Sequence, residues 1–359
     1  MHEDTVCLEK GAWAGKSSGA IAFALTFFVT FLCQDKKVNK RKAIVQTQYL
    51  KSFKLIFFNM NFENIQLGIA PINWTNDDMP ELGAENTFEQ CISEMALAGF
   101  TGCEVGNKFP RDITILKKAL SLRGLQICNQ WNSYELTTKS LEENKKNFTQ
   151  LLNFLEAMGA KVIGGGETGN SCQGKKDVPV LEGKGMLNSN EEWKNFTYGL
   201  NELGKIARDR GIKLAFHHHM GTCIQTREET ERMLNETDPE NVYLNYDCGH
   251  FYFAGEDPVA CLEQFISRTA HIHLKDIRPK TLQQVKDNRM SFLDAVKDGV
   301  FTVPGDEEGC IDFPALAAVI KKNDYKGWMV VEAEQDPAKA NPLEYALIAR
   351  QYIRKVTGL

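Results

Sequence analysis

The chain has 359 residues, of which 43% are hydrophobic and 25% are charged, and its formal net charge at pH 7 is −5. These values are typical of a globular protein with a sizeable core, and the negative charge argues against nucleic acid as the main partner. The ten cysteines contain no CxxC pair, which favours reduced thiols in a cytoplasmic enzyme over a disulfide framework.

The first 59 residues differ in charge from the rest of the chain. They hold nine Lys and Arg against four Asp and Glu, so they carry a local +5 and residues 60–359 carry −10. Their apolar run, Ala20–Leu32, is too short to span a bilayer comfortably, and no small-x-small cleavage site follows it. Met60 begins a segment that runs straight into the first expected strand. We therefore interpret 1–59 as a non-barrel extension, either upstream translation or disordered, in preference to a membrane or export segment.

From residue 65 onward, eight continuously apolar runs predict parallel strands that are covered on both faces. These runs are Ile65–Pro71, Gly102–Val105, Leu125–Gln130, Lys161–Gly165, Lys213–His217, Val242–Tyr246, Ala270–Leu274 and Trp328–Glu332. Helix-start patterns lie between them, at Thr87, Ser140, Ser189, Thr226 and Asp257. Eight β/α units over residues 60–359 predict a single (β/α)₈ barrel. A doubly wound open sheet is the alternative, but no Gly-x-Gly-x-x-Gly follows the first strand.

Polar side chains follow the expected strands, and the carboxyl ends of barrel strands share one face. Strands one to four are followed by Asn73 and Trp74, by Glu104 and Asn107, by Asn129 and Trp131, and by Glu167. Strands five to eight are followed by His217–His219, by Asp247 and His250, by His273 and Lys275, and by Glu332 and Glu334. This arrangement predicts one active site at that end of the barrel.

Three of these groups, Asp247, His273 and Glu332, are the strongest expected metal ligands, because they come from consecutive strands. Both His217 and Glu167 are candidates for the fourth ligand. Alternation along a strand sends His217 and His219 to one face and His218 to the other. Oxygen and imidazole ligands suit Mn²⁺, Co²⁺, Mg²⁺ or Zn²⁺. The alternative is that the histidines only satisfy hydrogen bonds at a polar barrel end.

A metal that binds a carbonyl and a neighbouring hydroxyl acidifies the α-proton and stabilises the enediolate. The expected acid and base groups are Glu167, His219, Lys275 and Glu334. Amide and indole side chains suit a small polyhydroxylated ligand, and the expected substrate contacts are Asn73, Trp74, Glu104, Asn107, Asn129, Trp131 and His250. An enediolate can lead to isomerisation, epimerisation or dehydration, and the residue pattern does not separate these reactions.

Four stretches of the chain resemble the myo-inosose-2 dehydratase family, at residues 67–83, 88–108, 216–222 and 330–337. The second contains Ala98-Gly-Phe-Thr-Gly-Cys-Glu-Val-Gly-Asn-Lys108, and the third is Phe216-His-His-His-Met-Gly-Thr222. The likeness runs from about Met60 to the C-terminus. The wider group is the xylose-isomerase-like barrels.

The resemblance implies a metal-dependent hydro-lyase of myo-inositol catabolism with a (β/α)₈ fold and manganese or cobalt. It implies dehydration of scyllo-inosose, a cyclic polyol ketone, to 3D-trihydroxycyclohexane-1,2-dione. A role for glutathione is implied by the family resemblance alone. The wider group's metal set is Glu, Asp, His, Glu, of which Asp247, His273 and Glu332 match the last three. The first position holds His217, which keeps Glu167 as a candidate.

Three rival functions remain for the same fold. An isomerase or epimerase would use the same metal and enediolate. A nuclease would want a basic face, which the −10 charge of residues 60–359 opposes, and a binding module would not need the metal set. We expect no membrane or nucleic-acid partner, and the sequence leaves a homo-oligomer open.

Overall fold

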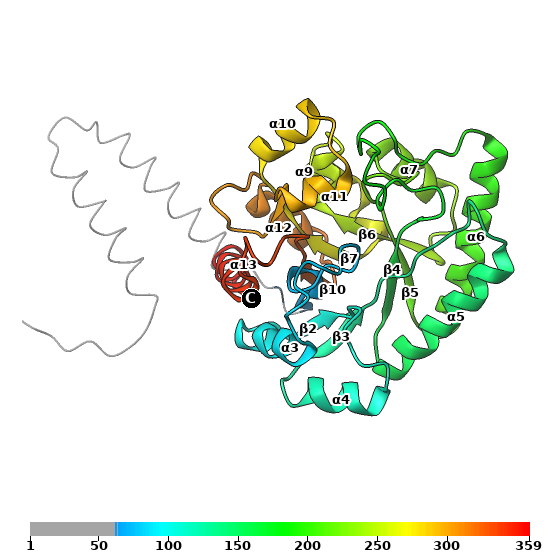
Figure 1. Cartoon of the computed structure of the whole chain (residues 1–359). Coiled ribbons are helices and arrows are strands. Elements are labelled where there is room, and N and C mark those ends of the chain that lie inside the picture. Colours follow the sequence, from blue (N-terminus) through cyan, green and yellow to red (C-terminus); the bar gives the residue numbers. More distant parts are fainter. Residues whose placement is uncertain (1–61, 63) are drawn as a thin grey trace, which may run out of the picture. The chain divides into compact units, whose positions relative to one another are not determined.

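The computed structural model describes Phe62 and residues 64–359 (Figure 1). Asn61–Leu359 form one compact unit. The extension predicted over residues 1–59 lies outside the described residues.

The predicted barrel of eight parallel strands is confirmed. Its strands are β1 (Ile65–Ile69), β2 (Gly102–Glu104), β3 (Gln126–Asn129), β4 (Val162–Gly165), β5 (Lys213–His217), β6 (Val242–Asp247), β7 (Thr269–Leu274) and β10 (Gly327–Val331). They are hydrogen-bonded in the order β3-β2-β1-β10-β7-β6-β5-β4, so the last strand in the chain pairs with the first. Each strand lies within or at most one residue beyond the run that predicted it, because strands buried on both faces are built mostly from apolar residues.

Helices surround these strands on the outside (Figure 1). They are α3 (Phe88–Leu97), α4 (Ile113–Ser121), α5 (Leu141–Met158), α6 (Asn190–Arg208), α7 (Arg227–Asn235), α8 (Cys248–Phe253), α9 (Pro258–Phe265), α10 (Pro279–Asp287), α11 (Phe292–Lys297), α12 (Phe313–Lys322) and α13 (Pro342–Thr357), with 3₁₀ turns η1 (Pro71–Asn73) and η2 (Ile266–Arg268). The capping boxes at Ser140, Ser189 and Thr226 form with both of their hydrogen bonds. These caps satisfy amides at the helix starts and fix where three of the helices begin.

A small antiparallel sheet was not predicted from the sequence. Strand β8 (Asp276–Ile277) pairs with β9 (Phe301–Thr302), and α10 and α11 lie between them in the chain. Two residues per strand are too few to produce a period in the sequence. This sheet follows β7 directly and brings Phe301 to the active-site end of the barrel.

The barrel has a seam between β3 and β4, where one side chain and isolated backbone bridges take the place of a strand ladder. The Asn129 Oδ1 accepts a hydrogen bond of 2.6 Å from the Gly164 amide, and the Asn132 amide donates to the Gly164 carbonyl at 2.7 Å. A Cβ at position 164 would lie 2.7 Å from the Asn129 Nδ2, so the close approach requires glycine there. The seam is therefore closed by one buried asparagine and a short run of loop backbone.

Eight cysteines of the described region carry free thiols, and all of them except Cys310 are buried. Among the described helices, none is both long and apolar enough to cross a membrane.

Candidate active site

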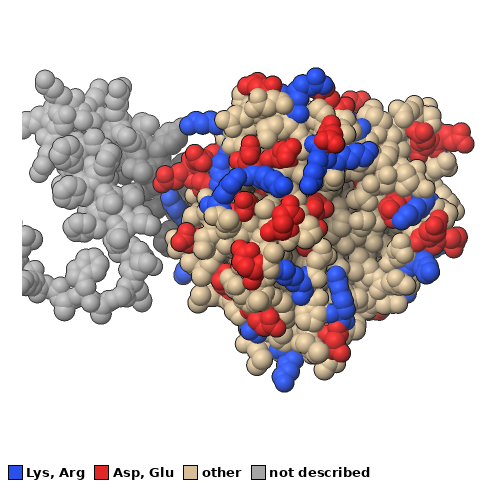
Figure 2. Space-filling view, in the orientation of Figure 1, with Lys and Arg blue, Asp and Glu red and all other residues tan. Residues whose placement is uncertain are grey.

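A cavity of about 270 Å³ opens at the carboxyl ends of the strands. Its described lining includes Asp77, Asp78, Glu104, Asn107, Gln130, Trp131, Gln173, His219, Glu332 and Glu334, with Ala70, Pro71, Ile72, Val105 and Ser133 as the smaller or apolar members. This lining contains five carboxylates and no Lys or Arg. Acidic and basic side chains are interspersed over the face of the molecule in Figure 2, with no continuous basic area. The cavity therefore suits a ligand that is neutral or cationic.

Asp247 stands at the centre of the buried polar groups, at the end of β6. Its Oδ1 accepts from the His250 amide at 3.0 Å and caps α8. Its Oδ2 faces the other way, 3.3 Å from the His217 Nε2 and 3.5 Å from the His273 Nδ1. The hydrogen bond to Oδ1 thus orients the side chain, and Oδ2 remains available to a ligand.

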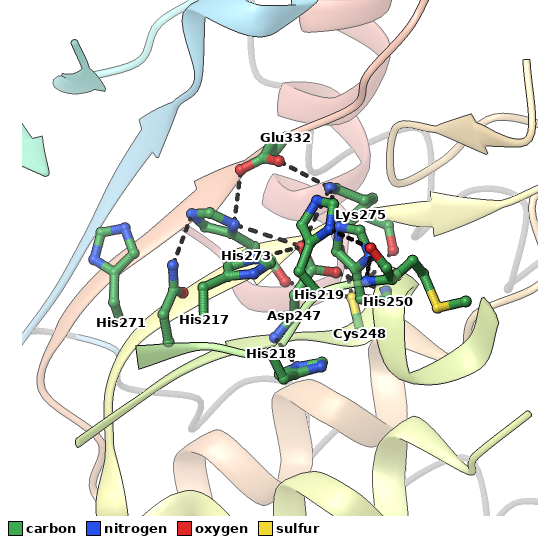
Figure 3. Close-up of polar contacts among 12 residues, drawn as sticks. His217, His218, His219, Asp247, Cys248, His250, His271, His273, Lys275 and Glu332 are labelled. Carbon is green, nitrogen blue, oxygen red and sulfur yellow. Dashed lines mark hydrogen bonds and ion pairs between the residues drawn. The ribbon is translucent and has the colours of Figure 1, made fainter. Parts of the chain in front are cut away.

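His273, on β7, adds the second imidazole (Figure 3). Its Nδ1 lies 2.7 Å from the Glu332 Oε2 but makes no hydrogen bond of normal geometry, although it is buried. Atoms of His217, Asp247 and His273 lie within 4.8 Å of one another. The structure therefore brings together His217, Asp247, His273 and Glu332, the four residues predicted as metal ligands.

The charges of this group favour a bound cation. Burial raises the pKa of Glu332, but the charges of His273 and Lys275 outweigh it and lower this pKa to about 2. Burial likewise raises the pKa of Asp247, and the charges of Lys275 and His250 hold it well below its usual range. Burial lowers the pKa of His273, whereas Glu332 and Glu104 raise it well above its usual range. Asp247 and Glu332 are thus ionised, and the carboxylates that hold a proton on His273 would also attract a metal, so these donors fit a divalent ion.

Lys275, which follows β7, lies beside the candidate metal ligands Asp247 and Glu332. Its Nζ lies 2.8 Å from both Glu332 and Glu334 and 3.4 Å from the Asp247 Oδ2. The stem passes over Gly249, where a Cβ would lie 2.7 Å from the Lys275 Cγ, and Nζ lies 4.6 Å from the centre of the Phe301 ring. Burial lowers the pKa of Lys275, but the charges of Asp247, Glu332 and Glu334 raise it well above its usual range. It is a fixed ammonium group beside the candidate ligands.

A second cluster contains His219, His250 and Glu334 (Figure 3 labels both histidines). The His219 Nδ1 lies 2.8 Å from the Met220 carbonyl, which only accepts hydrogen bonds, so the proton of neutral His219 sits on Nδ1. Its Nε2 is then unprotonated and lies 3.7 Å from the Glu334 Oε1, and His219 is one of the residues that line the cavity. The His250 Nε2 lies 3.0 Å from the Lys275 Nζ. A base and a proton donor therefore stand on either side of Glu334.

The predicted alternation of the three consecutive histidines is confirmed. His218 faces away from the cluster and stacks on Phe251 with ring centres 3.6 Å apart. Its Nε2 accepts from the Asp247 amide at 3.1 Å. His218 thus anchors the end of β6 from the far side.

The residues predicted to bind substrate divide into two groups. Asn107 and Trp131 line the cavity, together with Glu104, and His250 lies in the buried cluster. The other three make contacts within the protein. Trp74 is fully buried and donates to Glu94 at 2.6 Å, Asn73 accepts from the Ala333 amide at 3.1 Å, and Asn129 closes the barrel seam. The polar atoms of Trp74 and Asn129 are therefore paired within the protein, whereas the Asn73 Nδ2 is buried without a hydrogen-bond partner.

Glu167, predicted as an acid or base and as an alternative to His217 for the fourth metal ligand, lies outside both clusters and outside the cavity lining. Its two oxygens accept from the Leu136 amide at 2.9 Å, from the Gly169 amide at 2.9 Å and from the Thr137 hydroxyl at 2.8 Å. Burial raises the pKa of Glu167 to about 7, and these hydrogen bonds oppose the rise. The carboxyl group ties the loop after β3 to the loop after β4.

We expect Glu167→Ala to lower stability and to leave catalysis by the folded protein within about threefold of the parent. The change leaves buried donors unpaired, which costs about 1–3 kcal/mol for each. Because the pKa of Glu167 rises from 4.5 to about 7 on folding, the parent should lose stability as pH rises from 4.5 towards 7, and the variant should lose less. Thermal unfolding across this pH range measures both effects.

Glu182→Ala is the control, because Glu182 is exposed and lies in the loop after β4, as Glu167 does. A large loss of turnover in folded Glu167→Ala would contradict the structural role.

Some groups of the site gave no signal in the sequence. Asp78 contacts Gln173 at 2.8 Å and so joins the loops after β1 and β4 across the cavity mouth. Gly249 and Phe301 shape the slot for Lys275, and the Met220 carbonyl sets the His219 tautomer. Some of these contacts join residues far apart in the chain, and others are made by backbone atoms. The type of a residue in the sequence reveals neither kind of contact.

Comparisons with known proteins agree with the barrel fold. Residues 92–356 match the family model described as xylose isomerase-like TIM barrel. The inosose dehydratase of Clostridium beijerinckii is 55% identical over 299 residues, which cover 83% of this chain and 99% of that protein. The inosose dehydratase of Geobacillus thermodenitrificans is 57% identical over 295 residues, covering 82% of this chain and 98% of that protein.

Solved structures match at the level of the fold. The IOLI protein, solved with a bound zinc atom, gives a TM-score of 0.60 at 18% identity and covers 82% of this chain and 98% of its own. The probable 3-DHS dehydratase AsbF of Bacillus anthracis gives a TM-score of 0.60 at 15% identity, covering 80% of this chain and 98% of its own.

Proposed function

Since the chain belongs to the xylose isomerase-like TIM barrels and, within them, to the inosose dehydratases, we propose that it removes water from an inosose. The substrate we propose is scyllo-inosose, and the product is 3D-trihydroxycyclohexane-1,2-dione, as a step of myo-inositol catabolism. The observation that carries the proposal is the juxtaposition of the candidate metal ligands with His219, Lys275 and Glu334 beside one cavity.

The cavity supports a neutral polyol as the substrate. Its carboxylates and amides accept and donate hydrogen bonds to hydroxyl groups, and Trp131 offers an apolar surface to a ring face. The described lining has no Lys or Arg to pair with a phosphate or carboxylate group. A phosphorylated sugar would therefore be a poor substrate.

A divalent metal, Mn²⁺ or Co²⁺ by family, would be held by His217, Asp247, His273 and Glu332. When bound, it supplies Lewis acidity to the ketone oxygen and so acidifies the neighbouring C–H bond. The lack of thiolates among these four ligands suits such ions.

We assign proton removal to His219. This residue lines the cavity, and because the Met220 carbonyl keeps Nδ1 protonated, Nε2 of the neutral ring is free to take a proton. The nitrogen takes the proton from the carbon next to the ketone, and the electron pair of that C–H bond becomes the new carbon–carbon double bond.

We assign proton delivery to Lys275. As the C–O bond of the β-hydroxyl breaks, the ammonium gives this oxygen a proton and the group leaves as water. Glu334 lies 3.7 Å from the His219 Nε2 and 2.8 Å from the Lys275 Nζ, so it can pass the abstracted proton back to the lysine. The enol product then tautomerises to the dione, and the balance is loss of one water.

A product assay tests this function. Protein depleted of metal and reloaded with Mn²⁺ or Co²⁺ is mixed with scyllo-inosose, the ultraviolet absorbance of the dione is followed, and product mass is measured. We expect a metal-dependent absorbance and a product lighter by one water. A new isomer of unchanged mass would instead identify an isomerase or epimerase. The free thiols favour action in the reducing cytoplasm. Repeating the assay with and without glutathione tests whether this protein responds to glutathione as the family resemblance implies. Measuring the mass of the protein in solution tests whether it forms a homo-oligomer.

A further inference from the structure

The surroundings of Glu104 point to a function other than contact with substrate. This residue ends β2, is 9% exposed and receives hydrogen bonds from three side chains on one oxygen. They are the His271 Nε2 at 2.9 Å, the His273 Nε2 at 3.0 Å and the Asn129 Nδ2 at 2.9 Å, all on Oε1. Such a concentration of donors fixes the carboxylate firmly.

The carboxylate determines which nitrogen of His273 carries a proton. An ionised carboxylate only accepts hydrogen bonds, so the Nε2 that faces it must be the protonated nitrogen. The Nδ1 of neutral His273 is then unprotonated and faces the Asp247 Oδ2 and Glu332 Oε2 at 3.5 and 2.7 Å. The amide of Asn245 is 3.3 Å from Nε2, and turning its oxygen toward that proton leaves the assignment unchanged.

We propose that Glu104 is a positioning residue that holds the ring and tautomer of His273, so that Nδ1 is presented to the metal. His271 and Asn129 hold Glu104 in turn. Since Asn129 also bonds the Gly164 amide, the barrel seam, Glu104 and His273 form one connected chain of hydrogen bonds. This proposal rests on the proposed metal-dependent function and adds a residue outside the ligand set.

Carboxylate–histidine–metal arrangements have a measurable effect on affinity. Loss of the outer carboxylate costs about 10–100-fold in metal affinity, because ring orientation and ligand basicity both suffer. We expect Glu104→Gln, which keeps an oxygen acceptor but loses the charge, to weaken Mn²⁺ binding by about 10-fold. Glu104→Leu, which removes the acceptor, should weaken it by up to about 100-fold.

The control must separate positioning from general loss of negative charge. Asp77 lines the same cavity and accepts from the Asn107 amide at 3.3 Å, without a described contact to His273. Asp77→Asn should change Mn²⁺ affinity by less than about threefold. Equal losses in Asp77→Asn and Glu104→Gln would overturn the proposal, because charge alone would then explain both.

A measurement on the parent protein keeps the test independent of any variant. Nitrogen-15 NMR of the Zn²⁺-loaded protein should show His273 with a proton on Nε2 and none on Nδ1. A proton on Nδ1, or unchanged Mn²⁺ affinity in both folded Glu104 variants, would overturn the assignment. Dehydration of scyllo-inosose is measured separately, so a parent that binds metal with this tautomer but makes no dione would reject the proposed function and leave the role of Glu104 standing.

Discussion

The Asp247→Asn variant is expected to lose metal binding and dehydratase activity together while the barrel stays folded. The two oxygens of Asp247 have separate tasks, since Oδ1 caps α8 and Oδ2 faces His217 and His273. An asparagine oxygen can still cap the helix, because Asn and Asp are about equally good at this position. The negative charge at the centre of the ligand group is lost, and we expect metal affinity to fall by about 100-fold or more.

The measurements are Mn²⁺ titration, metal content after dialysis, thermal unfolding and production of the dione. Asp257→Asn is the matched control, because Asp257 caps α9 in the same way through the Ala260 amide and lies on an exposed helix end. It should leave metal affinity and turnover unchanged. If Asp247→Asn kept the parent's metal affinity, Asp247 would not be a ligand.

The second large effect is expected from Lys275→Met, which keeps an unbranched stem in the slot between Gly249 and Phe301 but removes the ammonium. Turnover should fall by about 10²–10⁴-fold, the usual contribution of a general acid. Metal affinity should hold or rise, since the ammonium 2.8 Å from Glu332 and 3.4 Å from Asp247 repels a second cation.

The same variant should also show a stability signature. Removing one partner of a buried ion pair costs about 3–5 kcal/mol, because the remaining charges are left uncompensated. A bound divalent ion replaces that charge, so added Mn²⁺ should raise the unfolding temperature of Lys275→Met more than that of the parent. Lys184→Met removes a partly buried lysine paired with Glu229 outside the site and serves as the control. Parent-like turnover in Lys275→Met would remove Lys275 from the mechanism.

Much of the fold could be read from the sequence for a simple physical reason. Parallel strands covered on both faces are rich in apolar residues, so each of the eight runs matched a strand of the barrel to within one residue. Helix starts were equally readable, because the capping box is a local pattern of side chain and backbone, as at Ser140. The seam was not readable, since it depends on the side chain of Asn129 reaching Gly164 across a gap in the ladder.

The location of the site could be predicted, but the tasks of single residues could not. The rule that strand ends share one face placed His217, Asp247 and His273 together, as the structure has them. The same rule also selected Trp74 and Asn129. Both lie near strand ends, but they are buried and make hydrogen bonds within the protein. Position along a strand does not say whether a polar atom meets a ligand or another part of the protein. That distinction needs its partners in space.

The pairing of β1 with β10 has a consequence for how a ribosome can make this protein. Synthesis releases the first three strands early, yet the outer partner of β1 is Gly327–Val331, close to the end of the chain. On the other side β3 meets β4 through Asn129 and loop backbone rather than through a ladder, so that edge offers little support in the meantime. β1 pairs with β2 on one edge, but its other edge stays unpaired until β10 is made, and such an apolar edge is a hazard for aggregation. We therefore expect the barrel to close, and any chaperone cover of β1 to end, only after Gly327–Val331 has left the ribosome.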